Sequence, residues 1–95
     1  MTRGIHNAAL ENEDFEKEIE RAVKRYLNND WGDLDDEDKA VNEYALRVSE
    51  RILGRYETSK GAIYIITERD RSATTILFAN EYWGEVRKWK LKIST

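Results

Sequence analysis

The chain has 95 residues, which suits a single domain over residues 1–95, and its 16 Lys and Arg against 19 Asp and Glu give a formal net charge of −3. The lack of cysteine excludes disulfides, thiolate metal sites and cysteine nucleophiles, and the single histidine, His6, leaves little for catalysis or metal binding. From this we expect a protein that is not an enzyme and uses no cofactor or metal. No apolar run approaches the ~20 residues of a membrane span, and we expect a cytoplasmic protein.

Residues 1–10 show no clear apolar period, and we expect part of this segment to be disordered. From residue 13 the apolar spacing becomes helical, which predicts a helix over 13–27 capped by Asn12 or Asp14. Its apolar face comprises Phe15, Ile19, Ala22, Val23, Tyr26 and Leu27.

A second apolar stripe predicts a helix over 36–53, with Asp35 as its N-cap and Gly54 at its C-terminal cap. Acidic residues crowd its first turn, where the helix dipole favours negative charge. The stripe comprises Val41, Tyr44, Ala45, Val48, Ile52 and Leu53.

Beyond Gly54 the period falls to two, which predicts strands over 55–58, 62–67 and 73–78 joined as two hairpins. A short helix or turn over 80–86 and a fourth strand over 88–93 are expected to follow. The fold class is therefore α+β, with two N-terminal helices packed on one face of a small antiparallel sheet. We expect the core to contain Phe15, Ile19, Val23, Val41, Ala45, Val48, Ile52, Ile65, Ile76 and Phe78.

Residues 30–38, the acidic run, hold six carboxylates and no basic residue. They are Asp30, Asp33, Asp35, Asp36, Glu37 and Asp38. The run can serve as a surface that imitates a nucleic-acid backbone and binds a basic groove, or it can be a helix start beside a solvated loop. Capping explains Asp30 and Asp33 poorly. Because Asp33 lies before the helix, we expect Asp33→Lys with Asp30→Lys to leave stability nearly unchanged. A calcium-binding loop that starts at Asp33 fits badly, because its sixth position is Asp38 where glycine is required and its twelfth is Tyr44 where glutamate is required.

The charged turn of Glu68, Arg69, Asp70 and Arg71 is a second candidate contact surface. It can recognise a partner, supply the charged residues of a small ribonuclease, or simply pair with itself in solvent. The basic residues of 87–92 around a tryptophan are typical of a nucleic-acid face or of a protected edge strand, and here we favour the edge strand.

The middle of the chain, residues 28–82, carries a set of residues that together resemble a known family. They are Asn42, Ala45, Leu46, Tyr56, Glu81 and Tyr82 and the stretches 29–32, 51–53, 58–61, 65–68 and 70–78, with 67–78 the most specific. The family that they resemble consists of small proteins of unknown function carried by plasmids, prophages and conjugative elements, mainly in Gram-positive bacteria. The resemblance implies a counter-defence setting, since mobile elements often encode anti-CRISPR and antirestriction inhibitors. It supplies no catalytic residues.

The leading hypothesis is a non-enzymatic inhibitor from a phage or mobile element, anti-CRISPR-like, whose partner is a bacterial defence protein such as a CRISPR effector complex or Cas nuclease. Its acidic surface would block a nucleic-acid-binding groove, and direct nucleic-acid binding is not expected. The alternative is a toxin–antitoxin component, either a small ribonuclease toxin or its regulator. A third reading is a structural accessory protein of a mobile element.

Overall fold

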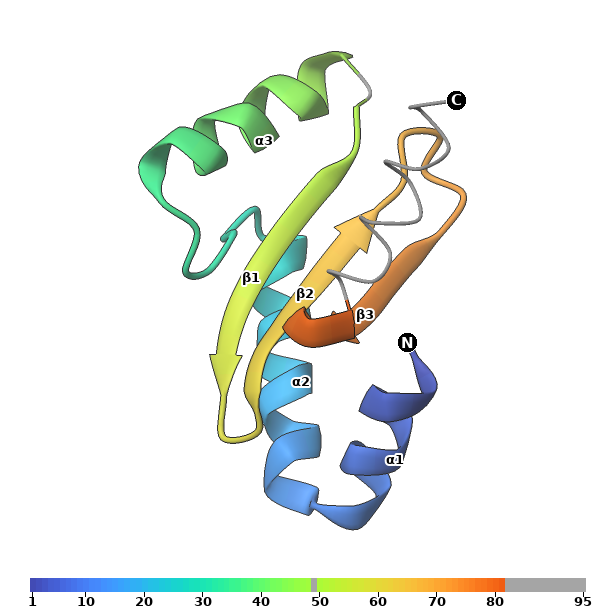
Figure 1. Cartoon of the computed structure of the whole chain (residues 1–95). Coiled ribbons are helices and arrows are strands. Elements are labelled where there is room, and N and C mark those ends of the chain that lie inside the picture. Colours follow the sequence, from blue (N-terminus) through green and yellow to red (C-terminus); the bar gives the residue numbers. More distant parts are fainter. Residues whose placement is uncertain (49, 82–95) are drawn as a thin grey trace.

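The structure of the protein is a computed structural model that describes residues 1–48 and 50–81. Among these residues, three helices precede a three-stranded antiparallel sheet, which confirms the α+β class but adds one helix to the predicted pair (Figure 1). The elements are α1 (Arg3–Glu11), α2 (Glu13–Leu27), α3 (Asp36–Val48), β1 (Ile52–Thr58), β2 (Gly61–Thr67) and β3 (Thr74–Phe78). The predicted strand over 88–93 and most of the segment over 80–86 lie outside the described residues. In the part of the chain described here, no helix is long and apolar enough to cross a membrane.

The prediction of disorder over 1–10 is wrong, because most of this segment forms α1. The Thr2 hydroxyl caps the helix by accepting from the Ile5 N–H at 3.4 Å, and the Thr2 N–H donates to the Ile76 carbonyl of β3 at 2.9 Å. Ile5 is fully buried. The apolar period of this segment is weak because α1 packs against the core through one large side chain, Ile5, and two small ones, Ala8 and Ala9.

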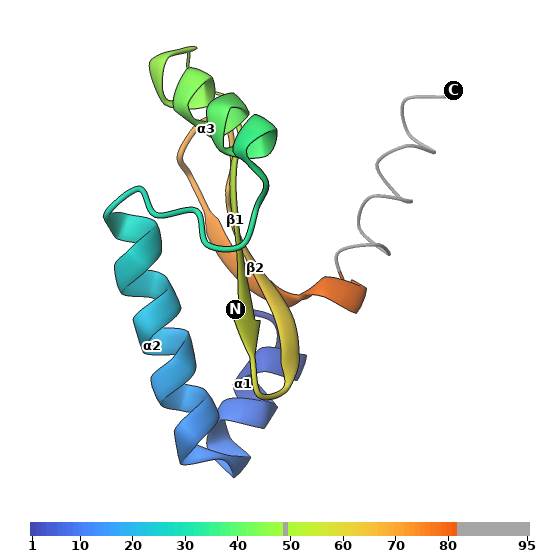
Figure 2. The same ribbon diagram turned by 90° about the vertical axis from the view of Figure 1, so that its left-hand side faces the viewer.

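Helix α2 has the predicted bounds, and Asn12 caps it by accepting from the Phe15 N–H at 3.1 Å. The sheet has the order β1-β2-β3, and α1 and α2 cover one of its faces (Figure 2). Register pairs Tyr56 with Ile63, so both side chains point to the helices. The core of this layer contains Ile5, Phe15, Ile19, Ala22, Tyr26, Trp31, Ala45, Ile52, Tyr56, Ile63 and Ile65.

The predicted helix over 36–53 is too long, because α3 ends at Val48 and Ile52 begins β1. The Asn42 side chain explains the break: its amide donates to the Leu53 carbonyl at 2.5 Å, and its oxygen accepts from the Leu53 N–H at 3.2 Å. These two bonds satisfy the backbone that a continuing helix would have paired internally. Gly54 is consequently a strand residue rather than a helix cap, and β1 starts three residues earlier than expected.

Two expected core residues are exposed: Val41 is 58% and Val48 44% accessible. Both lie on the outer side of α3, whose buried residues are Asn42 and Ala45. Half-buried positions are Val23, Ile76 and Phe78, and the other five predicted core residues are buried. The core prediction is thus correct for α2 and the sheet and wrong for most of α3.

Candidate functional site: the acidic run and helix α3

Asp30 is held inside its own loop. Its carboxylate accepts from the Arg25 guanidinium at 2.8 and 3.2 Å and from the Gly32 N–H at 3.0 Å. The Arg25 hydrogen bonds, with the Gly32 amide, lower the pKa of Asp30 below its ordinary value. The carboxylate therefore shapes the turn that leaves α2.

The backbone of the same loop rests on a buried tyrosine. The Tyr56 hydroxyl donates to the Asp30 carbonyl at 2.7 Å, and the Arg25 guanidinium lies 5.3 Å from the centre of the Tyr56 ring. Burial, followed by the nearby Asp30 charge, raises the pKa of Tyr56. This phenol is consequently a fixed hydrogen-bond donor that ties the loop to β1.

Asp33 also has a structural partner, since its carboxylate accepts from the Glu57 N–H of β1 at 2.9 Å. The Asp33 N–H in turn donates to the Arg55 carbonyl at 2.7 Å. The loop before α3 therefore runs along the outer edge of β1, in the manner of a short added strand. Asp30 and Asp33 each satisfy backbone groups that would otherwise lack these partners, so from the structure we expect their replacement to cost stability, contrary to the expectation from sequence.

The rest of the acidic run starts α3. Asp35 is the predicted N-cap, accepting from the Asp38 N–H at 2.8 Å. Asp36, Glu37 and Asp38 occupy the exposed first turn. None of these three acids forms an ion pair within residues 1–48 and 50–81, and no group of three or more His, Asp or Glu there could hold a metal ion. The three first-turn carboxylates, named here the acidic first turn, are the part of the run left open to a partner.

The second predicted surface, the turn over 68–71, pairs with residues near it. Arg69 binds the Glu50 carboxylate at 2.9 and 3.2 Å, and Arg51 lies 3.6 Å from the Glu68 carboxylate. The Asp70 carboxylate accepts from the N–H of Ser72 at 3.0 Å and from its hydroxyl at 2.6 Å, and these bonds lower the pKa of Asp70. Asp70 thus pairs within its own hairpin loop, while Glu68 and Arg69 pair with the segment between α3 and β1.

Arg71 fastens this turn to the end of α3. It adopts a left-handed backbone with φ of 62°, and its guanidinium donates to the carbonyls of Glu50 at 2.6 Å, Glu68 at 3.2 Å and Ala45 at 3.3 Å. The Ala45 carbonyl also accepts from the Glu50 N–H at 3.0 Å. Cations suit the last carbonyls of a helix, so Arg71 caps α3 from across the fold. The two predicted surfaces therefore lie at opposite ends of α3, about 18 Å apart by helix rise.

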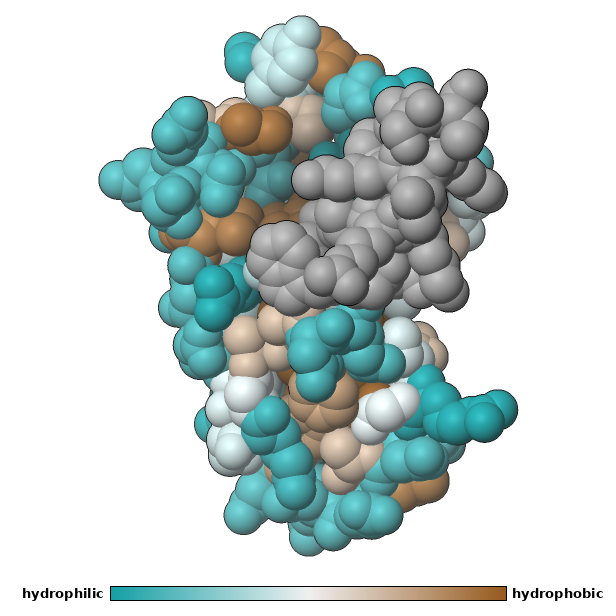
Figure 3. All heavy atoms as spheres, in the orientation of Figure 1, coloured by the Kyte–Doolittle hydropathy of each residue, from teal (hydrophilic) through white to brown (hydrophobic). Residues whose placement is uncertain are grey.

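The outer side of α3 carries a feature that sequence reasoning assigned to the core. Val41, Tyr44 and Val48, named here the α3 stripe, are 58, 57 and 44% accessible. They follow Glu37 at helical intervals of four, three and four, so Glu37 of the acidic first turn shares one face with the α3 stripe. Figure 3 shows hydrophilic and hydrophobic atoms reaching the surface together over α3.

These features define a small α+β protein whose candidate site is an exposed helix face, partly acidic and partly apolar. No family model, no curated protein and no solved structure matched the chain. The resemblance to proteins of mobile elements therefore stays a prediction. The basic segment 87–92 lies outside the described residues.

Proposed function

We propose that the protein is a non-enzymatic inhibitor of the anti-CRISPR type, which occupies a basic nucleic-acid-binding groove of a bacterial defence complex through the exposed face of α3. The observation that carries this proposal is the solvent exposure of the α3 stripe beside the acidic first turn. A helix that turns two valines and a tyrosine outward exposes apolar area that burial against a partner would stabilise.

The two parts of this face have different roles. Opposite charges mainly raise the association rate and set salt dependence, so the acidic first turn would steer the protein toward lysines and arginines of the groove. Tyrosine is enriched among residues that dominate binding energy, so Tyr44 is the expected anchor. The inhibitor would then block nucleic acid by occupying its site rather than by chemistry.

The contacts of the 68–71 turn also favour binding over catalysis. Arg69 and Arg71 are two of the four cations that the ribonuclease alternative would use, and the other two, Lys90 and Lys92, lie outside the described residues. Arg69 is engaged with Glu50 and Arg71 with three backbone carbonyls. A guanidinium held by three carbonyls is poorly placed to stabilise a developing phosphate charge, which weighs against a catalytic role for Arg71.

The test is inhibition of target-DNA cleavage by a panel of purified CRISPR effector complexes, each titrated with the protein. For the effector that is inhibited, we expect Tyr44→Ala to raise the inhibitory concentration about tenfold. Glu37→Lys should do the same most strongly at low salt. Glu11→Lys, the same charge change on the exposed end of α1, is the matched control and should inhibit like the parent protein.

Folding must be checked beside inhibition. Tyr44 and Glu37 are exposed, so each variant should melt close to the parent protein. Undiminished inhibition by both variants would refute the role of α3. Inhibition of no effector in the panel would remove the anti-CRISPR assignment, and cleavage of RNA by the purified protein would restore the toxin alternative.

A further inference from the structure

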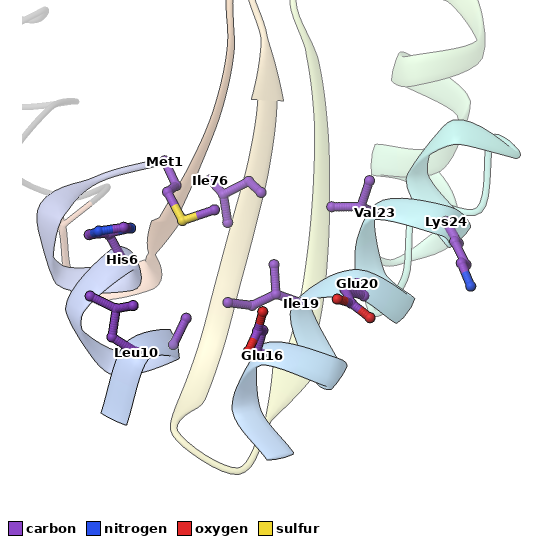
Figure 4. A pocket seen from close by; sticks show the side chains of 10 residues that line it. Met1, His6, Leu10, Glu16, Ile19, Glu20, Val23, Lys24 and Ile76 are labelled. Atoms are coloured by element: carbon purple, nitrogen blue, oxygen red, sulfur yellow. The ribbon is translucent and has the colours of Figure 1, made fainter. Parts of the chain in front are cut away.

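An apolar groove separates α1 from α2 above the sheet. Its volume is about 530 Å³, within the roughly 300–1,000 Å³ of ligand sites. Ile19 of α2 and Ile76 of β3 lie at its base, with Met1 and Leu10 on one side and Val23 on the other (Figure 4). A single residue, Asn12, joins the two helices, so they diverge from that point and leave the space open.

The α1 side of the groove is conspicuously exposed for apolar side chains: Leu10 is 74% and Met1 59% accessible. The α2 side is a single rim, because Glu16, Glu20, Val23 and Leu27 follow one another at intervals of four, three and four. Leu27 at the end of this rim is 74% accessible. The groove therefore continues as an apolar rim beyond its deepest part.

The rim carries more negative than positive charge where it meets the groove, with Glu16 and Glu20 against Lys24. Glu16 and Glu20 are one helical turn apart and repel each other, and neither forms an ion pair with a described residue. Lys24 follows one turn later, and His6 faces the groove from α1. A ligand with a positive charge beside its apolar surface would satisfy the two carboxylates.

We propose that this groove binds a basic amphipathic helix of a partner protein, with apolar side chains seated over Ile19 and Ile76 and a lysine or arginine beside Glu16 and Glu20. The rim from Glu16 to Leu27 is about 16 Å long, or three helical turns, which matches the usual anchors of helix-in-groove binding. This inference does not rest on the proposed function, since it uses α1 and α2 rather than α3.

A second copy of the chain fits the groove less well. The exposed apolar stripe of α3 begins with three carboxylates, which would meet Glu16 and Glu20 as like charges. An uncharged small molecule would fill the apolar space but leave the two carboxylates without a partner. Charge complementarity therefore selects a basic helix among these occupants.

The test uses a fluorescein-labelled 15-residue peptide of leucine and lysine, with the leucines on one helical face, and a scrambled peptide of the same composition. Binding is followed by fluorescence anisotropy and mapped by amide chemical-shift changes in ¹⁵N-labelled protein. We expect the ordered peptide to bind and to shift the amides of Leu10, Glu20 and Ile76, while the scrambled peptide binds at least tenfold more weakly.

Variants separate the groove from general attraction to an acidic protein. Glu16→Gln with Glu20→Gln should lower the affinity for the ordered peptide about three- to tenfold. Leu10→Gln should lower this affinity about tenfold, because apolar burial is lost. Asp36→Asn with Glu37→Gln removes the same charge from α3 and should leave the affinity unchanged within about twofold. All of these side chains are exposed, so the variants should fold.

Equal binding of the ordered and scrambled peptides would overturn the proposal, as would equal weakening by the α2 and α3 charge variants. Shifts confined to α3 would overturn it as well. Self-association in sedimentation experiments that disappears in Leu10→Gln would give the groove to a second copy instead. The basic-helix site would be established if the affinity for the ordered peptide falls in the double charge variant of α2 and in Leu10→Gln, but not in the double charge variant of α3.

Discussion

Arg71 offers a sharp test of how the fold holds α3, because its backbone and its side chain act in opposite directions. The backbone sits at φ of 62°, a left-handed conformation that costs a non-glycine residue about 1 kcal/mol. The guanidinium donates to three carbonyls at 2.6–3.3 Å. Alanine and glycine at this position therefore remove the same hydrogen bonds but differ in backbone strain.

The expected magnitudes follow from this difference. Two of the three hydrogen bonds are exposed to solvent, which weakens them. We therefore expect the three bonds together to contribute about 2 kcal/mol to the free energy of unfolding, toward the low end for bonds from a charged group. Arg71→Ala keeps the strain and should lose about 2 kcal/mol of unfolding free energy. Arg71→Gly relieves the strain of about 1 kcal/mol but adds about 0.5 kcal/mol of entropy to the unfolded chain, so it should lose about 1.5 kcal/mol of unfolding free energy.

Thermal unfolding followed by circular dichroism measures both variants. A domain of this size shifts its Tm by about 4–8 °C per kcal/mol, so Arg71→Ala should melt about 8–16 °C lower and Arg71→Gly about 6–12 °C lower. Arg69→Ala is the control, since its exposed pair with Glu50 contributes at most about 1 kcal/mol. A glycine variant less stable than the alanine variant would refute the strain argument, and an unchanged alanine variant would refute the capping role.

Three further outcomes are expected. Gly32→Ala puts a Cβ 1.9 Å from a β1 carbonyl oxygen at φ of 75° and should abolish cooperative unfolding, whereas Gly61→Ala meets nothing within 4 Å and should cost only about 1–2 kcal/mol for its positive φ. In urea, Asp33→Ala should lose about 1 kcal/mol with its bond to β1, and Asp36→Ala only a few tenths. The lowered pKa of Asp30 means its stabilisation is present above the ordinary carboxyl pKa and is lost as pH falls below about 4, so Tm should drop there and drop less in Asp30→Asn.

Helix α2 and the sheet were predictable because their local signals and their burial agree. In α2 the apolar spacing, the Asn12 cap and the acidic first turn all indicate the same boundaries. The strands show the period of two and the β-branched residues that a half-buried sheet favours. A segment can be predicted from sequence alone when its local signals and its burial in the fold indicate the same structure.

Helix α3 was misread because its amphipathic pattern does not point at the core. The apolar stripe read as buried is the exposed side, and the buried side is carried by a polar residue, Asn42, and a small one, Ala45. The value of Asn42 lies in two hydrogen bonds to Leu53, a partner 11 residues away. A long-range contact of this kind leaves no periodic trace, and neither does the cap that Arg71 supplies from the far hairpin.

The acidic run shows how one sequence feature can hold two kinds of residue. Asp30 and Asp33 bind their own loop and strand β1, so lysine at either position would disturb the fold along with any interface. Loss of activity in such a variant would therefore not separate contact from stability. Glu37 leaves the loop intact and faces outward on the same side as Tyr44, so α3 is the place where binding can be changed while folding is kept. An interface built on that helix predicts that charge and apolar variants there fail together, and that variants of the loop fail only as far as they unfold.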